Sequence, residues 1–432
     1  MKLTIVGGGY VGLTTGICFS HLGHEVKLVE KVQEKVNVLK EGILPIYEPG
    51  LEELLKESLK LQRISFTTDF VEGLEFSDII FICVGTPQQE DGSADLSQVE
   101  EVARLTAQHM RSYKLLVEKS TVPVNTHKLV KKTLQRYMKN QVEFDVASNP
   151  EFLREGNAVK DFLEPDRIVI GVESERAKEM MQELYKPINA PIIFTDPATA
   201  ELIKHASNSF LAMKISFINM VSDLCEKTGA DVKLVADGMG YDKRIGRAFL
   251  NAGIGWGGSC FPKDVKAFIK MAQDYGVDFS LLKEVEKINA KRIERFIEKV
   301  KGVLWSVRNK RIAVWGLSFK PNTDDIREAP SIKIVSALLK DGAKLQVYDP
   351  KAMNNFKRLF PESGNLIYAK DMYEAVEGCE ALLILTEWEE FKNADLDKVK
   401  RLLKLPIVVD GRNIYEPSKM KEVGFEYYCM GR

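Results

Sequence analysis

Cys260 is the cysteine whose surroundings most strongly suggest chemistry, because it ends the glycine-rich segment Gly255–Cys260. A free cysteine is usually a small buried hydrophobic residue, but a polar, glycine-rich segment makes a poor core. So many glycines also suggest backbone that lies against a ligand. A helix that begins directly after this segment would favour the thiolate through its N-terminal dipole. The pattern therefore predicts a nucleophilic cysteine, with the acid Asp264 following on the same segment and Lys263 directly before that acid.

Lys204 and Asn208 are a second candidate pair, because they have the spacing i, i+4 inside residues 198–228, a long segment without proline or glycine. This spacing places both side chains on one face of a helix. An ammonium and an amide together can stabilise an oxyanion. An exposed polar helix face would have the same pattern, so both interpretations stay open.

Glu151 and Glu155 are candidate bases, since they lie one helical turn apart after the predicted strand 144–148. Either carboxylate could activate a water molecule. Alternatively, both could simply decorate the first turn of a helix.

A dinucleotide site is predicted by Gly7, Gly9 and Gly12, which form the pattern G-x-G-x-x-G directly after the apolar segment Leu3–Val6. Glycine allows the tight turn, the close approach of backbone to a pyrophosphate and close packing of helix on sheet. The N-terminus of the following helix supplies N–H donors and a partial positive charge.

Glu30 ends the second predicted strand, where a carboxylate binds ribose hydroxyls and repels a 2′-phosphate. This predicts NAD rather than NADP, although Lys31 and Lys35 lie nearby and could touch the pyrophosphate or tolerate a phosphate. Thr86 and Thr121 each follow the carboxyl end of an expected strand, where ligands bind in open α/β sheets. Each threonine either contacts the cofactor or caps the segment that follows it.

These residues need a frame of alternating strands and helices, and residues 1–196 have that pattern. Continuous apolar segments such as residues 78–84 indicate strands buried on both faces. Residues 197–300 are mostly helical, with expected helices at 198–228 and 279–300 around the glycine-rich segment. Residues 301–432 return to alternation. We therefore predict an α/β fold with two doubly wound Rossmann-like domains, joined by a helical central domain that contains a long helix.

The second alternating region echoes the first at low resolution. In each, a strand leads into a small-residue turn and a helix, and the next strand ends in an acid, Glu30 or Asp349. Later strands end at Thr86 and Thr386. We interpret this echo as similarity of architecture only.

Composition excludes several classes of function. The 432 residues have a formal net charge of -1, so the chain as a whole does not attract nucleic acid or an anionic membrane, and we expect neither partner. The six cysteines have no zinc-like spacing, so we expect no metal. The N-terminus lacks the pattern of a secretory signal, and no apolar run approaches a membrane span. We therefore expect a cytoplasmic protein.

Ordered motifs along nearly the whole chain resemble one known family. The chain is similar to the UDP-glucose 6-dehydrogenases, within the wider UDP-glucose/GDP-mannose dehydrogenase family. The motifs are residues 7–12, 47–51, 85–87, 119–123, 149–156, 201–208, 249–264, 316–320 and 410–412.

The resemblance implies oxidation of the C6 alcohol of UDP-glucose to a carboxylate, with two NAD⁺ reduced. Cys260 would add to the aldehyde, and oxidation of the thiohemiacetal would give a thioester that water hydrolyses. Lys204 and Asn208 would stabilise oxyanions, and Asp264 would assist proton transfer. The resemblance leaves open which of Glu151 and Glu155 activates water, and suggests that the remaining catalytic residue, Thr121, holds that water.

The resemblance also implies two sets of contacts. The cofactor would contact Gly7, Gly9, Tyr10, Val11, Gly12, Glu30, Lys35, Thr86, Thr121, Glu155, Lys263 and Arg327. The nucleotide sugar would contact Glu151, Phe152, Leu153, Lys204, Asn208, Arg244, Phe249, Leu250, Asn251, Gly255, Phe319, Lys320 and Arg412.

Three alternatives remain at this point. The substrate could be GDP-mannose or a UDP-N-acetylhexosamine, with unchanged chemistry. The chain could be a one-step hydroxyacid dehydrogenase with an idle Cys260, or a regulator that senses NAD. The resemblance further implies a homodimer or larger homo-oligomer, in which the long central helices pack together and Arg244 reaches across the interface.

Overall fold

The computed structural model describes residues 1–432, which form two compact units. The first unit contains Met1–Ser207 and Lys266–Val277, and the second contains Asn208–Val265 and Asp278–Arg432. The boundaries fall inside helices or close to their ends, because α9 (Pro197–Thr228) and α11 (Phe261–Asp274) each contribute residues to both units. The division of the chain into three domains stays a prediction.

The first unit is built on an eight-stranded sheet with the order β3-β2-β1-β4-β5-β6-β7-β8. Neighbouring strands are parallel except β6 and β7, which pair antiparallel. The strand order reverses between β1 and β4, the switch point at which open parallel sheets bind ligands. The strands are β1 (Lys2–Val6), β2 (Glu25–Val29), β3 (Ile64–Thr67), β4 (Ile79–Ile82), β5 (Lys114–Glu118), β6 (Phe144–Ser148), β7 (Ile168–Gly171) and β8 (Ile192–Thr195).

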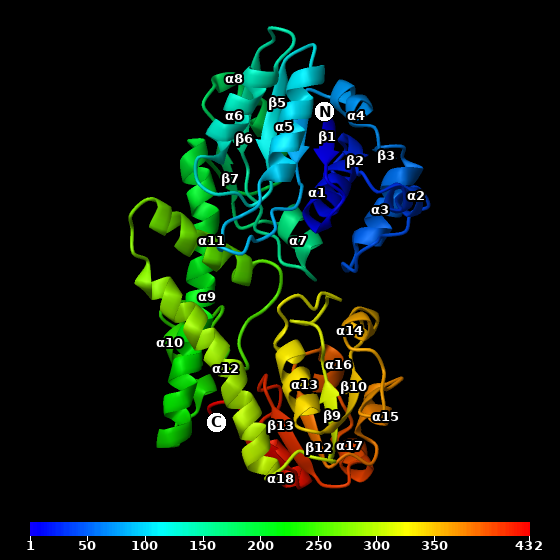
Figure 1. The fold of residues 1–432 in the computed structure, drawn as a ribbon, viewed down its shortest axis with the longest axis vertical. Helices are drawn as coiled ribbons and strands as arrows, with labels where there is room; N and C mark the ends of the chain where they lie inside the picture. The colour runs from blue at the N-terminus through cyan, green and yellow to red at the C-terminus, as the bar shows by residue number, and fades with distance from the viewer. The chain divides into compact units, whose positions relative to one another are not determined.

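Helices cover both faces of this sheet (Figure 1). Alternate residues of one strand enter different cores: Ile5 packs with Leu13 of α1, whereas Val6 packs in the cluster that contains Val102 of α5. Burial on both faces explains why these strands are apolar throughout. The helices are α1 (Tyr10–His21), α2 (Gln33–Lys40), α3 (Leu51–Lys60), α4 (Phe70–Phe76), α5 (Ser97–His109), α6 (Thr126–Tyr137), α7 (Ala158–Leu163) and α8 (Glu175–Tyr185).

The second unit contains a six-stranded sheet, all parallel, with the order β11-β10-β9-β12-β13-β14. The strands are β9 (Arg311–Trp315), β10 (Lys344–Tyr348), β11 (Leu366–Tyr368), β12 (Ala381–Ile384), β13 (Ile407–Asp410) and β14 (Glu426–Tyr428). Val314 faces a core shared with Ile334 of α13, and its neighbour Ala313 faces the opposite core with Val399 of α17. The helices are α13 (Pro330–Lys340), α14 (Met353–Leu359), α15 (Met372–Val376), α16 (Glu389–Lys392), α17 (Leu396–Leu402) and α18 (Pro417–Val423).

Three further helices belong wholly or partly to the second unit: the later part of α9, α10 (Val232–Gly240) and α12 (Ser280–Leu304). Ile218 of α9 and Val232 of α10 form a small core with Leu250, which anchors the residues just before the glycine-rich segment on these helices.

The predicted fold class is confirmed, since both parallel sheets and the long helix α9 are present. The prediction missed β3, β7, β8, β11 and β14. These strands have three or four residues each, and β8 is only partly buried, so none carries a long apolar signal. No helix combines the length and the apolar character needed to cross a membrane.

Candidate active site

The glycine turn between β1 and α1 has the geometry expected for a dinucleotide. Gly7 has a φ of 111°, and a Cβ atom there would lie 2.6 Å from the Cys83 carbonyl oxygen. A Cβ on Gly12 would overlap the Gly7 carbonyl, whereas a Cβ on Gly9 would meet no atom within 4 Å. The backbone at Gly9 is therefore open to approach beside the N-terminus of α1, which fits a pyrophosphate.

Glu30 lies directly after β2 and is 7% exposed. Its Oε2 accepts a hydrogen bond from the Gly8 N–H at 3.0 Å, and its Oε1 accepts one from the Val32 N–H at 2.9 Å. The Lys35 ammonium lies 3.9 Å from the same carboxylate. Glu30 therefore holds the glycine turn, and it stands at the strand end where the fold would present it to a ribose.

The ends of β4 and β5 are tied together by hydroxyl groups. Thr86 Oγ1 donates to the Thr121 carbonyl at 2.9 Å, and Ser120 Oγ donates to the Val84 carbonyl at 2.7 Å. The Thr86 hydroxyl thus holds in place the segment that carries Thr121.

Glu151, Phe152, Leu153 and Lys204 come together in the first unit. The Lys204 ammonium donates to Glu151 Oε1 at 3.0 Å and lies 5.4 Å from the centre of the Phe152 ring. The Leu153 N–H donates to Glu151 Oε2 at 2.5 Å. Both charged groups are buried, so the pair is little screened by solvent.

Lys119, beside this cluster, has a buried ammonium that was not among the predicted site residues. Its Nζ donates to Asn149 Oδ1 at 3.0 Å and to the Tyr185 hydroxyl at 3.3 Å. Burial lowers the pKa of Lys119 to about 8, and the charge of Glu151 opposes part of that shift. A lysine at the end of an apolar strand was the signal that could have identified it.

Glu48 links two parts of the predicted site, and it lies in the motif 47–51. Its carboxylate accepts the Tyr10 hydroxyl, the Gly156 N–H at 2.6 Å and the Ala158 N–H at 2.7 Å. Burial and the charges of Glu48 and Glu155 raise the pKa of Tyr10. Glu48 therefore fastens the first residue of α1 to the segment that carries Glu155.

In the second unit, Cys260 lies directly before α11, as the sequence predicted. Its carbonyl accepts the Asp264 N–H at 2.8 Å, and its Sγ lies 3.6 Å from Ser259 Oγ. Cys260 is partly exposed at a helix N-terminus, where the dipole favours negative charge. The other cysteines are buried, and burial raises the pKa of each thiol; they are Cys18, Cys83, Cys225, Cys379 and Cys429.

Asp264 is held between two donors. Asn208 Nδ2 donates to Asp264 Oδ2 at 2.7 Å, and Lys263 Nζ donates to Asp264 Oδ1 at 2.6 Å. The sequence paired Asn208 with Lys204, and the two remain four residues apart on α9, but the boundary between the units falls between them. Each polar group therefore has a carboxylate partner in its own unit.

Buried polar side chains of α9 and α12 grip the segment before Cys260. Asn219 Oδ1 accepts the Gly253 N–H at 2.9 Å, and Arg292 Nε donates to the Gly253 carbonyl at 2.7 Å. Asn289 accepts the Trp256 N–H at 2.8 Å and donates to its carbonyl at 2.9 Å. These side chains satisfy the backbone of a buried loop, and their positions on helices gave no local signal in the sequence.

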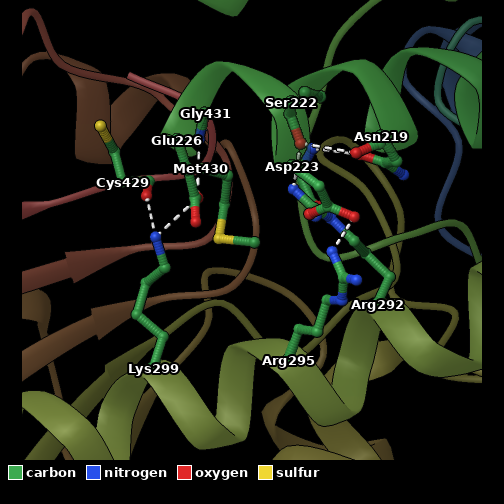
Figure 2. Close-up of polar contacts among 12 residues, drawn as sticks. Asn219, Ser222, Asp223, Glu226, Arg292, Arg295, Lys299, Cys429, Met430 and Gly431 are labelled. Carbon is green, nitrogen blue, oxygen red and sulfur yellow. Dashed lines mark hydrogen bonds and ion pairs between the residues drawn. The ribbon is translucent and has the colours of Figure 1, made fainter. Parts of the chain in front are cut away.

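Figure 2 shows the polar contacts that join α9 and α12 beside this segment. The Arg292 guanidinium also binds Asp223 and donates to Ser222 Oγ at 2.5 Å, and Asp223 binds Arg295 as well. Burial lowers the pKa of Arg292 to about 10.

The C-terminal residues are held by the same two helices (Figure 2). Glu226 of α9 accepts the Gly431 N–H at 2.9 Å, and Lys299 of α12 donates to the Cys429 carbonyl at 2.7 Å. Met430 exchanges two hydrogen bonds with the side chain of Asn413, both 2.8 Å long. Asn413 follows Arg412, so the C-terminal segment supports a predicted sugar-binding residue.

The glycines near Cys260 pack against protein. A Cβ on Gly255 would lie 2.6 Å from Asn289 Oδ1, and one on Gly258 would lie 2.6 Å from the Phe319 ring. Both residues have positive φ angles, of 100° and 86°. Close packing within the second unit therefore requires these two glycines, and the approach of a ligand to this segment stays a prediction.

Arg412 binds the backbone of two other predicted sugar-binding segments. Its guanidinium donates to the carbonyls of Leu385 at 2.8 Å, Gly255 at 3.0 Å and Phe319 at 3.4 Å. Lys320 is next to Phe319 in the sequence, and its ammonium is 5.3 Å from the centre of that ring.

Other predicted contacts are not drawn into these clusters. The Arg244 side chain is 89% exposed and pairs with Asp242, and Arg327 is 64% exposed and pairs with Asp325. The remaining predicted residues of this region are Phe249, with a φ of 64°, Leu250, which is buried in the core, and Asn251, which accepts Arg247. The roles of all these residues stay predictions.

The fold and the site together define a class of protein: an NAD-binding dehydrogenase with a partly exposed cysteine on a helix N-terminus. The chain belongs to the UDP-glucose/GDP-mannose dehydrogenase family. Residues 1–189 match the NAD binding domain of that family, residues 198–291 its central domain and residues 313–417 its UDP binding domain. The resemblance that we identified from motifs is thereby confirmed, and so is NAD as the cofactor.

Individual relatives cover the whole chain. UDP-glucose 6-dehydrogenase TuaD of Bacillus subtilis (strain 168) is 46% identical over 431 residues, which cover 100% of this chain and 93% of that protein. The structure of a UDP-glucose dehydrogenase from the archaeon Pyrobaculum islandicum has a TM-score of 0.92 at 39% identity, covering 99% of this chain and 96% of that one. A UDP-D-ManNAc dehydrogenase from Pyrococcus horikoshii has a TM-score of 0.87 at 29% identity, covering 100% and 99%.

Proposed function

We propose that this enzyme oxidises the C6 alcohol of UDP-glucose to a carboxylate, giving UDP-glucuronate with two NAD⁺ consumed per sugar. The observation that carries the proposal is the place of Cys260, the one cysteine of the chain that is not buried, at the N-terminus of α11. Sequence identity supports UDP-glucose as the sugar. The chain is 46% identical to the UDP-glucose 6-dehydrogenase TuaD and 29% identical to the UDP-D-ManNAc dehydrogenase.

A cysteine is needed because an aldehyde alone cannot readily surrender a second hydride. Bound NAD⁺ supplies the hydride acceptor for each of the two oxidations. Between them, the Cys260 thiolate adds to the C6 aldehyde and forms a C–S bond, which gives a thiohemiacetal. Loss of hydride from that adduct leaves a thioester, so free aldehyde need not leave the enzyme.

Lys204 and Asn208 stabilise the negative charge that develops on the C6 oxygen during addition. Asp264, which accepts the amide of Asn208 at 2.7 Å, assists proton transfer through water and orients that amide.

Hydrolysis of the thioester requires a base toward water. Glu151 or Glu155 removes a proton from the attacking water, which Thr121 holds, and the Cys260 thiolate is the leaving group. The Lys204 ammonium, which donates to Glu151 Oε1 at 3.0 Å, holds that carboxylate in place.

The nucleotide sugar is held mainly by the second unit. Arg412 and Lys320 supply the positive charge that a diphosphate needs in a chain of net charge -1. Since Arg412 already binds Gly255 and Phe319, the site is organised before the substrate arrives. We place the reaction in the cytoplasm, where thiols stay reduced.

The stoichiometry of NADH formation tests the proposal directly. We expect two NADH per UDP-glucose consumed. One NADH per UDP-glucose would contradict oxidation through a Cys260 thioester and would indicate a one-step dehydrogenase. The same assay with GDP-mannose and UDP-N-acetylhexosamines should give much lower kcat/KM. Higher kcat/KM for either would reassign the sugar.

Substitution of Cys260 tests the nucleophile. Cys260→Ser should bind both ligands but lose at least about 10³-fold in production of the acid, because an alcohol is a far weaker nucleophile than a thiolate. Cys379→Ala is the matched control, since that thiol is buried in a core of the second sheet. Full acid production by Cys260→Ser would contradict the assignment.

The exposed face of α9 supports a homodimer or larger homo-oligomer. Phe210, Phe217 and Leu224 repeat every seven residues and are 57%, 51% and 62% exposed, and Met220 lies between them. Helices with apolar residues at this period pack against one another. Phe217→Asp should therefore give a smaller species by light scattering, whereas Leu359→Asp, at an exposed leucine of α14, should not. An unchanged mass for Phe217→Asp would refute this interface.

A further inference from the structure

The Glu118 carboxyl group is buried and lacks the hydrogen-bond donors that would stabilise its ionised form. Glu118 ends β5 and is 1% exposed, and no N–H or O–H group of a neighbouring donor reaches either of its oxygens. The group that it contacts is another carboxyl, that of Glu201. An ionised Glu118 would lack water, donors and a cation, and it would face a like charge, which is prohibitively costly in a protein interior.

Glu201 has the opposite surroundings. It lies on α9, and its Oε2 accepts the Asn125 N–H at 2.5 Å. Its Oε1 accepts both the N–H and the Nδ1 of His127 at 3.0 Å. Three donors point at Glu201, so the charge of the pair belongs on Glu201 and the proton belongs on Glu118.

No other group changes this balance. His127 of α6 is the titratable residue that faces the pair from outside it, and it faces Glu201. Lys119 follows Glu118 in sequence but points to the opposite face of the sheet, toward Asn149 and Tyr185. Burial and the charge of Glu201 together raise the pKa of Glu118 well above the ordinary value for glutamate.

The pair joins three elements that carry candidate catalytic residues. Glu118 is at the end of the strand that leads to Thr121. The donors to Glu201 are Asn125, directly before α6, and His127 in the first turn of α6, at the end of that same segment. Glu201 itself precedes Lys204 by about one turn of α9.

We propose that Glu118 holds a proton at neutral pH and donates it to Glu201, and that Glu201 is thereby the positioning residue that fixes the Thr121 segment against the turn of α9 bearing Lys204. The protonation of Glu118 stands on its own. The positioning role rests on the proposed function, in which Thr121 and Lys204 serve the reaction.

Infrared spectroscopy of the whole protein tests the protonation without turnover. The difference spectrum of wild type minus Glu118→Gln at pH 7 should contain the C=O stretching band of a protonated carboxyl. Absence of this band would overturn the proposal. Asp349→Asn is a matched control that should show no such band, because Asp349 is equally buried, directly after β10, but accepts Leu317 N–H, Lys351 N–H and Ala352 N–H at 2.7, 2.9 and 2.7 Å.

Stability gives a second, independent readout. Above the ordinary pKa of glutamate, the unfolded wild type releases the proton that the native state keeps, so wild-type stability falls as pH rises. Glu118→Gln keeps a donor toward Glu201 and has no proton to release. Its folding equilibrium constant relative to wild type should therefore rise by about tenfold per pH unit from about pH 5 upward. A difference that does not vary with pH would overturn the proposal.

Kinetics tests the positioning role. Glu118→Leu, which removes the donor, should lower kcat by about tenfold to a hundredfold with little change in KM for UDP-glucose, because small displacements of reacting groups are costly. Glu118→Gln should recover most of that loss. Glu201→Gln should resemble the leucine variant, since one amide oxygen cannot accept three donors. Equal kcat values for Glu118→Leu and Glu118→Gln would refute the role of the shared hydrogen bond.

Failure of the proposed function can be distinguished from failure of the proposed protonation of Glu118. If UDP-glucose is not oxidised by the wild type, the proposed function falls, whereas the infrared band and the pH dependence of stability remain to support or refute the protonated Glu118.

Discussion

The two parallel sheets of this protein share a frame that extends to individual hydrogen bonds. After β1, Gly7 has a φ of 111° and donates to the Val29 carbonyl at 2.9 Å. After β9, Gly316 has a φ of 95° and donates to the Tyr348 carbonyl at 2.9 Å. The echo that the sequence revealed only coarsely is therefore a repeated strand–turn–strand geometry.

The sheets differ in the segment that comes after the turn. In the first unit α1 begins at Tyr10, so its N-terminus stands beside the glycine turn. In the second unit α13 begins at Pro330, and residues 317–329 intervene. Only the first turn therefore presents free helical N–H groups and a dipole to a pyrophosphate.

The acids after the second strand differ as well. Glu30 accepts two backbone N–H groups, from Gly8 and Val32. Asp349 is 1% exposed and accepts donors on both oxygens: Oδ2 accepts Leu317 N–H at 2.7 Å and Trp388 Nε1–H at 3.1 Å, and Oδ1 accepts Ala352 N–H at 2.7 Å. The Asp349 carboxylate is thus fully occupied by donors from its own unit, whereas the Glu30 carboxylate can accept further hydrogen bonds from a ligand. The same strand–turn–strand geometry can therefore either bind a ligand or stabilise its own loop. The segment that follows the turn decides which.

Strands β5 and β13 occupy corresponding places in the two sheets and extend the comparison. Register aligns Val6, Ile82 and Glu118 in the first sheet, and Trp315, Ile384 and Asp410 in the second. Both strands end in a buried acid, but Glu118 faces a carboxyl and Asp410 faces donors. The next residue is Lys119 in one sheet and Gly411 in the other, where a side chain would collide with Ile254.

Asp349→Asn should give the largest effect of this comparison. The amide places an NH₂ group against some of the donors that Asp349 now accepts, and each buried donor left unsatisfied costs about 1–3 kcal/mol. We expect urea unfolding to show a loss of about 4 kcal/mol, by summing two such donors. NAD⁺ affinity, measured by calorimetry, should stay within about twofold, and an equal loss of NAD⁺ binding would break the distinction between the two acids.

Lys119→Met should give a pH-dependent effect in the first sheet. The native pKa of Lys119 is about 8, below the ordinary value for lysine of about 10.4. Between these values the native state has released a proton that the unfolded chain keeps, so wild-type stability rises with pH over this window. The stability of the wild type relative to Lys119→Met should increase by about 3 kcal/mol from pH 8 to pH 10.4.

The control for this experiment is the exposed Lys344→Met, at the start of β10. Its stability relative to wild type should follow a flat line across the same window. A flat line for Lys119→Met as well would show that Lys119 is not the titrating group.

Glu30→Gln should give the smallest effect. Removing the charge weakens the bond to the ribose hydroxyls and abolishes repulsion of a 2′-phosphate, so the preference for NAD⁺ over NADP⁺ should fall by about tenfold, or about 1.4 kcal/mol. Calorimetric titration with both cofactors measures this ratio. Glu25→Gln, at the exposed start of β2, is the control, and an unchanged ratio for Glu30→Gln would remove Glu30 from the cofactor site.

Local pattern predicted the parts of this protein that depend on neighbours in sequence. Residues Leu3–Val6, the glycine turn and the helix after Cys260 were predicted because their signals lie within a few residues. Short strands such as β11 and β14 were missed, since three residues carry too little periodicity. The grip of Asn289 and Arg292 on the segment before Cys260 was also missed, because polar residues on a helix are expected to face solvent.

By itself, the sequence determined the alternation of strands and helices, the cofactor turn, the odd position of Cys260 and the family to which the chain belongs. Only the tertiary structure decided which polar groups face one another. It paired Glu151 with Lys204 and Asn208 with Asp264, it saturated Asp349, and it left Glu118 against Glu201. The reason is physical: the charge state of a buried group depends on donors and acids from distant segments, which sequence spacing does not bring together.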